Sequence, residues 1–445
     1  MDTAWVRRFD GPANKSDIIT RMVVDGWGNA TVTGHSDGGD ETSDDYLTIK
    51  YTTDGEQYWQ QRYNAHGNAV DWATGLAQDH QHNLIVTGYS GFSPSYYYLT
   101  IKYRPDGSEV WRQRFDPGTS TGCYATAVAV DASDNIIVTG SCSDPAGLNA
   151  DWITVKYDSS GNLLWTARFA GPANDEDAPT CLTVDDRANI YVAGYVRVLH
   201  DPPPDADFAV VKYNARGEEQ WAKIWNNRNA DDKIAAIKVD AQGNVYVTGS
   251  SWTGRNMSDH PNYQTFKYDS MGNQGWGDNY DGGSGADYPA DLAVDRFGNC
   301  YVTGSSFSSG TVNYATIKYT PSGTRERVII YDGAGHSADQ ATALAIDTAG
   351  RIYVTGGALN AQGNMDIVTF CYNPDGSVLW WAQFDGTDGN DDIGAAIGLD
   401  DGLNVYVAGK TFGQATKYDY IVLKYACGTS AVAEQRRALG LLNLQ

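Results

Sequence analysis

Apolar and polar positions alternate with a period of two through most of the chain, in short runs separated by Gly, Asn and Asp. Segments such as 245–249 and 314–319 are rich in β-branched and aromatic residues, a composition typical of strands. Turn pairs such as Gly243-Asn244 lie between two such runs, as in a β-hairpin. Helical stretches do not occur before residue 431. The pattern predicts an all-β fold.

The tripeptide Val-Thr-Gly or Val-Ala-Gly recurs eight times, with 52 to 55 residues between successive glycines. Each period holds four strand-like runs. The third run resembles Tyr-x-Thr-Ile-Lys-Tyr, as at 46–51, and the fourth usually begins with Trp, as at Trp59. Four antiparallel strands in about 50 residues is the size of a β-propeller blade. The repeat therefore predicts an eight-bladed β-propeller of four-stranded antiparallel blades. The repeat glycines are Gly34, Gly88, Gly140, Gly194, Gly249, Gly304, Gly356 and Gly409.

The two ends of the repeat array are complementary. Residues 5–9 read as a fourth strand with no first three before it, and the last repeat stops at a third strand, 420–425. We expect the N-terminal strand to complete the last blade and close the ring, which removes two exposed sheet edges. The propeller is expected to span 1–427. Residues 428–445 differ in composition and are expected to form a tail or linker that leads to a sorting domain missing from this chain.

The repeat motifs resemble those of a known family. Gly-Asn-x-Tyr-Val-Thr-Gly, Asp-Tyr-x-Thr-Ile-Lys-Tyr and Gly-x-x-x-Trp-x-x-Arg-Tyr are similar to the bacterial SBBP β-propeller repeat, over roughly residues 3–426. The similarity to NHL repeats is looser. The resemblance implies a secreted or surface-anchored bacterial propeller, frequently one module of a longer protein, with no family-wide catalytic residues. Such a resemblance supports the fold more strongly than the function.

Charge narrows the range of partners. The chain has 55 acidic and 32 basic residues, a net charge of −23, and only 8 of the acidic residues are Glu. The excess of Asp agrees with a fold rich in turns. A strongly acidic chain disfavours nucleic acid as a partner. The absence of an apolar run of about 18 residues predicts no membrane insertion.

Asp also recurs eight residues before the Asp that ends each first strand. Seven of the eight blades have Asp there, and Cys123 is the exception. A carboxylate ring of this kind could hold Ca²⁺, which binds oxygen ligands, or attract a cationic ligand. Alternatively, each Asp bonds the backbone N–H groups of its own loop. No firm cofactor is predicted, and Ca²⁺ is the cation that the ring suggests. The residues are Asp17, Asp71, Asp177, Asp232, Asp287, Asp339 and Asp392.

Two cysteines of the third blade are placed to meet. Cys123 begins its first strand and Cys142 ends its second, at equal distances from a turn near Ser133. Residues so placed face each other across a hairpin, which predicts a disulfide if the protein is secreted. The pairing would also explain why Cys123 interrupts the Asp series.

Two insertions between second and third strands, 91–98 and 197–205, lie on the same Asp-rich face and offer Tyr96, Tyr97 and His200. Aromatic side chains beside carboxylates suit sugar rings or a protein partner. We therefore expect a non-catalytic extracellular binding or scaffolding propeller that presents this face to a protein or glycan at the cell surface. One alternative is a structural subunit that self-assembles into a cell-surface polymer. The other is a polysaccharide-active enzyme that uses the same face, although no nucleophile elbow, zinc motif or phosphate loop is present.

Overall fold

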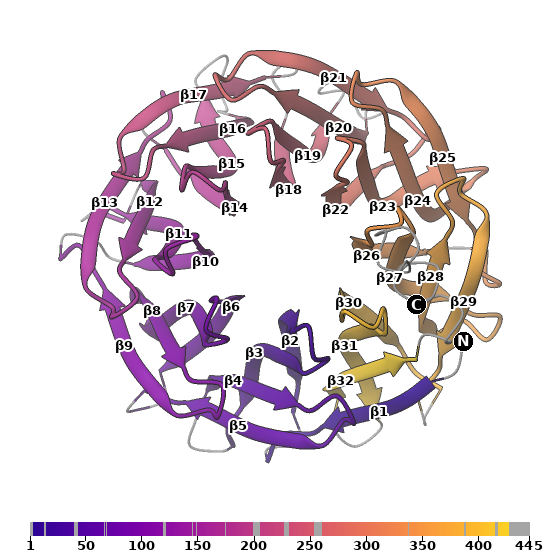
Figure 1. The fold of residues 1–445 in the computed structure, drawn as a ribbon, viewed down its shortest axis with the longest axis horizontal. Helices are drawn as coiled ribbons and strands as arrows, with labels where there is room; N and C mark the ends of the chain where they lie inside the picture. Colours follow the sequence, from indigo (N-terminus) through magenta and orange to yellow (C-terminus); the bar gives the residue numbers. More distant parts are fainter. Residues whose placement is uncertain are drawn as a thin grey trace, which may run out of the picture.

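A computed structural model describes residues 3–426, apart from 13–14, 40–42, 66, 68, 119–121, 145, 148, 174, 199–204, 227–230, 253–259, 337, 387–388 and 414–416. The described residues form eight four-stranded sheets arranged as the blades of a ring (Figure 1). The predicted eight-bladed propeller is confirmed. The predicted tail at 428–445 lies outside the described residues. No helix in the described part of the chain is long and apolar enough to cross a membrane.

The first four blades follow one another along the chain, each running from its innermost to its outermost strand. Blade 1 consists of β2 (Asp17–Val24), β3 (Ala30–Asp37), β4 (Asp44–Tyr51) and β5 (Gln57–Tyr63). Blade 2 consists of β6 (Val70–Gln78), β7 (Leu84–Phe92), β8 (Ser95–Tyr103) and β9 (Glu109–Phe115). Blade 3 consists of β10 (Cys123–Val130), β11 (Ile136–Ser143), β12 (Ala150–Tyr157) and β13 (Leu163–Phe169). Blade 4 consists of β14 (Ala178–Val184), β15 (Ile190–Val198), β16 (Asp205–Tyr213) and β17 (Glu219–Trp225).

The last four blades continue in the same order. Blade 5 consists of β18 (Asp232–Val239), β19 (Val245–Trp252), β20 (Pro261–Tyr268) and β21 (Gln274–Tyr280). Blade 6 consists of β22 (Tyr288–Val294), β23 (Cys300–Ser308), β24 (Thr311–Tyr319) and β25 (Arg325–Tyr331). Blade 7 consists of β26 (Gln340–Ile346), β27 (Ile352–Leu359), β28 (Met365–Tyr372) and β29 (Val378–Phe384). Blade 8 consists of β30 (Asp392–Leu399), β31 (Val405–Gly413), β32 (Lys417–Tyr425) and the N-terminal β1 (Thr3–Phe9).

The ring closes as the two ends of the sequence predict. Strand β1 pairs antiparallel with β32, so that Val6 lies opposite Leu423 and Phe9 opposite Tyr420. Trp5 packs in a cluster of buried side chains drawn from blades 8 and 1. The first and last strands of the chain are therefore joined by hydrogen bonds and by a shared apolar core.

The repeat tryptophan of the outermost strand packs on the next blade. The Trp59 indole N–H donates to the carbonyl oxygen of Pro105 at 2.9 Å, and a Cβ on Gly107 would lie 2.7 Å from the Trp59 ring. Trp5 makes the corresponding bond across the closure, to the carbonyl oxygen of Thr53 at 3.0 Å. The Gly and the Trp of the Gly-x-x-x-Trp motif therefore each contact a neighbouring blade.

The repeat glycine of the second strand is required by a close approach of backbones. A Cβ on Gly34 would lie 2.0 Å from the carbonyl oxygen of Ile18 on the innermost strand. At Gly409 the corresponding distance to the Ile393 carbonyl oxygen is 2.1 Å. Any side chain there would force the two innermost strands of the blade apart, which explains the glycine in every repeat.

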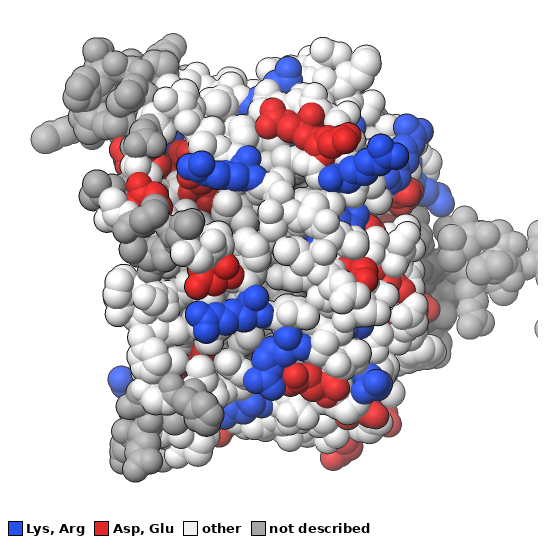
Figure 2. All heavy atoms as spheres, turned by 90° about the vertical axis from the view of Figure 1, so that its left-hand side faces the viewer, with Lys and Arg blue, Asp and Glu red and all other residues white. Residues whose placement is uncertain are grey.

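The ring has two faces, which we name by their connections. The turn face carries the turns between first and second strands and between third and fourth strands. The entry face carries the loops that lead into the first and third strands. On the side of the ring around β9 and β13, Figure 2 shows basic and acidic side chains interspersed among uncharged ones. The net negative charge is therefore not gathered into one patch on that side.

Candidate carboxylate site between the blades

The seven predicted ring aspartates lie within one residue of the start of the innermost strands, on the entry face, and they are buried, at most 1% exposed. The Asp177 carboxylate accepts the backbone N–H of Gly171 at 2.5 Å and of Arg197 at 2.7 Å. Asp287 likewise accepts N–H groups from Gly282 and Phe307, both at 2.9 Å. Asp177 and Asp287 thus each tie the loop that enters the innermost strand to the end of the second strand of the same blade.

Burial changes the protonation of these groups. Removal from water raises the pKa of Asp17, Asp177 and Asp392 to about 6, although the hydrogen bonds to each carboxylate act in the opposite direction. The pKa values of Asp71, Asp287 and Asp339 are raised by the same cause. The entry face therefore contains carboxylates that gain or lose a proton near neutral pH, where a cation would compete with the proton.

Three ring aspartates, Asp17, Asp287 and Asp392, are each approached by two residues of the preceding blade. One of the two lies near the start of the third strand, and the other follows the outermost strand. We call these three positions a junction at every pair of neighbouring blades. Five junctions have an Asp at the third-strand position, and at three of these five the outermost strand supplies a cation. Arg62 contacts Asp45 at 3.0 Å, Arg8 contacts Asp419 at 2.5 Å, and Arg168 pairs with Asp151.

The junction of blades 7 and 8 lacks this cation. Asp366, Asp385 and Asp392 each place a carboxylate oxygen there, and the three oxygens lie within 4.8 Å of one another. Gln383 occupies the position of the arginines and donates to Asp366, which also receives an N–H of Asn360 at 2.9 Å. The Asp392 side chain is 1% exposed, and its Oδ1 atom is buried without a hydrogen-bond partner. A buried carboxylate oxygen faces two further carboxylates here.

Two other triplets occur among the described residues. Asp10, Asp17 and Asp419 meet at the junction of blades 8 and 1, where Arg8 is bound to Asp419. His260, Asp281 and Asp287 meet at the junction of blades 5 and 6. The structure thus brings three of the seven ring aspartates into clusters with spacing suited to a metal ion. The other four, Asp71, Asp177, Asp232 and Asp339, belong to no such triplet in the described part of the chain.

The third blade departs from the carboxylate pattern. Cys123 lies opposite Cys142 in the β10–β11 register, with Cα atoms 4.1 Å apart, and the structure joins them in a disulfide. The bond occupies the place where other blades have a ring aspartate and its loop. The same junction has Tyr97 where other blades have Asp or Asn. A covalent link thus stands where the other blades use hydrogen bonds to a carboxylate.

The aromatic insertion of blade 2 is partly buried. The Arg114 guanidinium lies 3.7 Å from the centroid of the Tyr97 ring, and the Ser90 hydroxyl donates to the Tyr97 oxygen at 2.9 Å. Tyr96 packs against Tyr89 and Tyr124, with ring centroids 5.6 and 5.2 Å away. These tyrosines mainly support the loop that they belong to. His200 lies outside the described residues.

Three residues on the innermost strands, two of them charged, were not found from the sequence. Arg21, Cys181 and Asp291 follow the β-bulge, at a position that is Gly or Ala in the other five blades. Asp291 also bonds the backbone N–H of Leu344 in the next blade at 3.0 Å. Burial raises the pKa of Asp291, while the charges of Lys238 and Arg21 lower it. Alignment of the repeats at the residue four before each strand-ending Asp would have revealed the three departures.

Comparison with known proteins agrees with the fold. The SBBP beta-propeller repeat family matches residues 280–309, which confirms the resemblance seen in the motifs. Regulatory protein FlaEY of Caulobacter vibrioides is 31% identical over 113 residues, 23% of this chain and 12% of that protein. An uncharacterized WD repeat-containing protein of Acanthamoeba polyphaga mimivirus is 22% identical over 350 residues, 70% of this chain and 22% of its own length. The chain thus spans less than a quarter of either relative.

Among solved structures, Sqt1 from Chaetomium thermophilum superimposes with a TM-score of 0.60 at 9% sequence identity. The match covers 96% of this chain and 100% of that one. At this identity the likeness concerns the propeller fold alone.

Proposed function

Because the chain carries an SBBP repeat within a closed eight-bladed ring, we propose that it is a binding or scaffolding propeller whose entry face holds a divalent cation. The observation that carries the proposal is the junction of blades 7 and 8. Three carboxylates meet there with no arginine beside them, and the Oδ1 atom of Asp392 is buried without a partner. The other oxygen of Asp392 accepts the backbone N–H of Gly386. A buried carboxylate oxygen that has no donor is costly unless it binds a metal.

Ca²⁺ is the cation that suits this set of ligands. It takes six to eight oxygens and tolerates irregular geometry, so three carboxylates and water would complete its shell. Asp385 is exposed, whereas Asp366 and Asp392 are buried, so the ion would lie at the surface with coordination positions open to solvent. A carboxylate or hydroxyl group of a protein or glycan partner could occupy those positions. The ion would then link the propeller to its partner.

Such a protein is proposed to work outside the cell or at its surface. The Cys123–Cys142 disulfide supports that location, since structural disulfides persist in oxidising compartments. Calcium is also abundant enough outside cells to fill a site of modest affinity. Partner binding through the ion is the proposed activity. Self-assembly would be the case in which the partner is a second copy of the chain.

Isothermal titration of CaCl₂ into the full chain, stripped first with EDTA, tests the proposal. Gln383→Arg is the informative variant because it introduces at this junction the cation that other junctions have. We expect the wild type to bind Ca²⁺ and to melt at a higher temperature with it, as linkage requires. Gln383→Arg should keep the fold and lose the binding.

Asp116→Asn is the matched control. Asp116 holds the same place as Asp385 in the repeat, but its junction has Cys123 and Tyr97 instead of carboxylates. This variant should bind Ca²⁺ as the wild type does. A wild type that binds no Ca²⁺, or a Gln383→Arg variant that binds it undiminished, would overturn the proposal. If the wild type binds Ca²⁺, sedimentation with and without Ca²⁺ shows whether the partner is another copy of the chain.

A further inference from the structure

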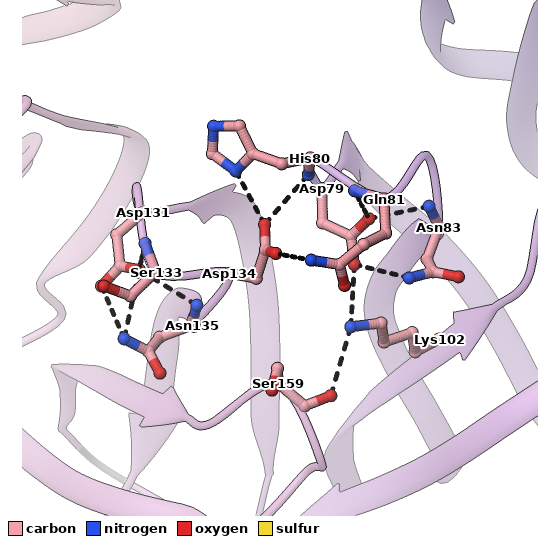
Figure 3. A network of polar contacts seen from close by, with 10 residues as sticks. All are labelled: Asp79, His80, Gln81, Asn83, Lys102, Asp131, Ser133, Asp134, Asn135 and Ser159. Carbon is pink, nitrogen blue, oxygen red and sulfur yellow. Dashed lines mark hydrogen bonds and ion pairs between the residues drawn. The ribbon is translucent and has the colours of Figure 1, made fainter.

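In most blades the lysine of the third strand forms an ion pair or a hydrogen bond. Figure 3 shows it in blade 2, where the Lys102 ammonium contacts the Asp79 carboxylate at 2.8 Å and donates to the carbonyl oxygen of Ser159 at 3.2 Å. Lys156 and Asp131 repeat the ion pair in blade 3, also at 2.8 Å. The lysines of blades 4, 5, 6 and 8 each have a hydrogen-bond or ion-pair partner as well. These lysines link their own blade to its turns or to the next blade.

Lys50 of blade 1 is the departure from this pattern. The residue is 5% exposed, and its ammonium has no hydrogen bond or ion pair with the described residues. Its counterpart carboxylate, Asp25, accepts the backbone N–H groups of Trp27 and Asn29 and the Asn29 side chain, the same three bonds that Asp79 accepts in blade 2. Burial lowers the pKa of Lys50, and the charge of Asp25 only partly offsets this effect. The fold therefore keeps an ammonium, on a largely buried side chain, without a hydrogen-bond or ion-pair acceptor among the described residues.

Lys50 lines a cavity of about 470 Å³ on the turn face, between blades 1 and 2. Its other walls include the aromatic rings of Trp27 and Tyr58, which are 67% and 58% exposed, and the side chains of Asn29 and Thr52. The volume lies in the range of small-molecule sites. Two large rings that stand open to solvent beside a cation form the kind of exposed apolar patch that marks an interaction site.

Between blades 2 and 3, polar bonds close the position on the turn face where blades 1 and 2 leave the cavity. In blades 2 and 3, His80 and Gln81 both donate to the Asp134 carboxylate, which draws the two turns together (Figure 3). In blades 1 and 2 the positions of Gln81 and Asp134 are held by Trp27 and His82, whose rings lie 4.4 Å apart. The cavity thus results from substitutions on both blades, and these substitutions bring aromatic surface to the unpaired lysine.

We propose that this cavity binds a uronic acid unit of an acidic polysaccharide. The Lys50 ammonium would donate to the sugar carboxylate in a charge-assisted bond. The apolar face of the pyranose ring would pack on Trp27 or Tyr58, and Asn29 and Thr52 would meet its hydroxyl groups. Asp25 also lines the cavity, so the site takes one carboxylate among hydroxyls and disfavours a polyanion such as a nucleotide. The site lies on the opposite face from the carboxylate junctions and is independent of them.

Isothermal titration of the full chain with digalacturonate, and with neutral galactobiose for comparison, tests the proposal. EDTA in the buffer separates this site from the cation site of the entry face. We expect the wild type to bind digalacturonate at least tenfold more tightly than galactobiose. Lys50→Met, which removes the charge and keeps the stem, should abolish that preference. Trp27→Ala should weaken the binding of both sugars.

Two variants at equivalent positions elsewhere serve as controls. Phe297→Ala changes the turn residue that corresponds to Trp27 in blade 6 and is 66% exposed. Lys267→Met changes the corresponding lysine of blade 5, which donates to the carbonyl oxygen of Pro321 at 3.3 Å. Both should bind digalacturonate as the wild type does, and a thermal melt of each variant verifies its fold. Equal affinity of the wild type for the two sugars, undiminished binding by Lys50→Met, or tighter binding of benzoate than of digalacturonate would overturn the proposal.

Discussion

Replacing the third-strand lysine by methionine should have opposite effects in blades 1 and 2. Lys102 and Asp79 form an ion pair at 2.8 Å whose side chains are 3% and 0% exposed. Loss of one partner leaves the other as an uncompensated buried charge, which costs roughly 3–5 kcal/mol. Three hydrogen bonds remain on the Asp79 carboxylate and place Lys102→Met near the lower limit.

Lys50→Met removes a charge from a side chain that is 5% exposed and that has no hydrogen-bond or ion-pair partner among the described residues. Methionine has a similar length and no charge to desolvate, so the free energy of unfolding should stay constant or rise. The two variants are matched in residue type, strand position and burial. They differ in whether a carboxylate loses its cation.

Differential scanning calorimetry at pH 7 compares the two directly. A loss of about 3 kcal/mol in a chain of this size corresponds to a decrease in melting temperature of roughly 3–6 °C, because the entropy of unfolding grows with chain length. Lys102→Met should show this decrease, and Lys50→Met should melt at or above the wild-type temperature. If both variants lose the same stability, then Lys50 is paired in solution and the reasoning about the turn-face cavity fails with it.

Three further predictions concern closure, the disulfide and pH. Trp5→Ala should lower the melting temperature more than Trp59→Ala, because only β1 is held to its blade without chain continuity. Both tryptophans are 9% exposed, so equal losses would argue against a closure that limits stability. Protein purified from an oxidising compartment should lack free thiols at Cys123 and Cys142, which intact-mass spectrometry measures. Reduction of this disulfide, whose cysteines are 19 residues apart, should lower the free energy of unfolding by about 3 kcal/mol, as measured by melts with and without reductant. Asp392 has a folded-state pKa of about 6, raised above the unfolded value, so its contribution to stability falls as pH rises from about 4 through 6. Asp392→Asn should flatten that part of the calcium-free stability curve, and an unchanged slope would assign the titration to other groups.

The fold could be predicted from the sequence because its determinants are local and repeated. The alternation of strands, the turn residues and the spacing of Gly34 to Gly409 each carry information over a few residues, and eight copies make the signal unambiguous. The closure by β1 followed from counting strands. The meeting of Cys123 and Cys142 followed from the symmetry of a hairpin, and the register places them opposite each other.

The candidate carboxylate site was harder to predict from the sequence than the fold. The ring aspartates were recognised as a series, but the series does not tell whether a carboxylate points outward or into its own loop. The clustering of Asp366, Asp385 and Asp392 depends on two loops and two blades, so no single motif contains it. A clue did exist within the repeat: the residue 17 positions after the third-strand Asp is Arg62 in blade 1 and Gln383 in blade 7. Comparing blades pairwise, position against position, would have revealed the missing cation.

The two candidate sites arise by the same physical route. In a ring of equivalent blades, a polar group that recurs in most copies is satisfied by a partner that also recurs, as Lys102 is by Asp79. A binding site can then be made by changing residues around one copy. Gln383 leaves an anionic junction without its arginine, and Trp27 with His82 replace the polar pair of the next two turns and leave Lys50 beside an open aromatic cavity. The two sites therefore need opposite ligands, a cation on the entry face and an anion on the turn face. Restoring the usual partner by Gln383→Arg should therefore remove the first site with no effect on the second.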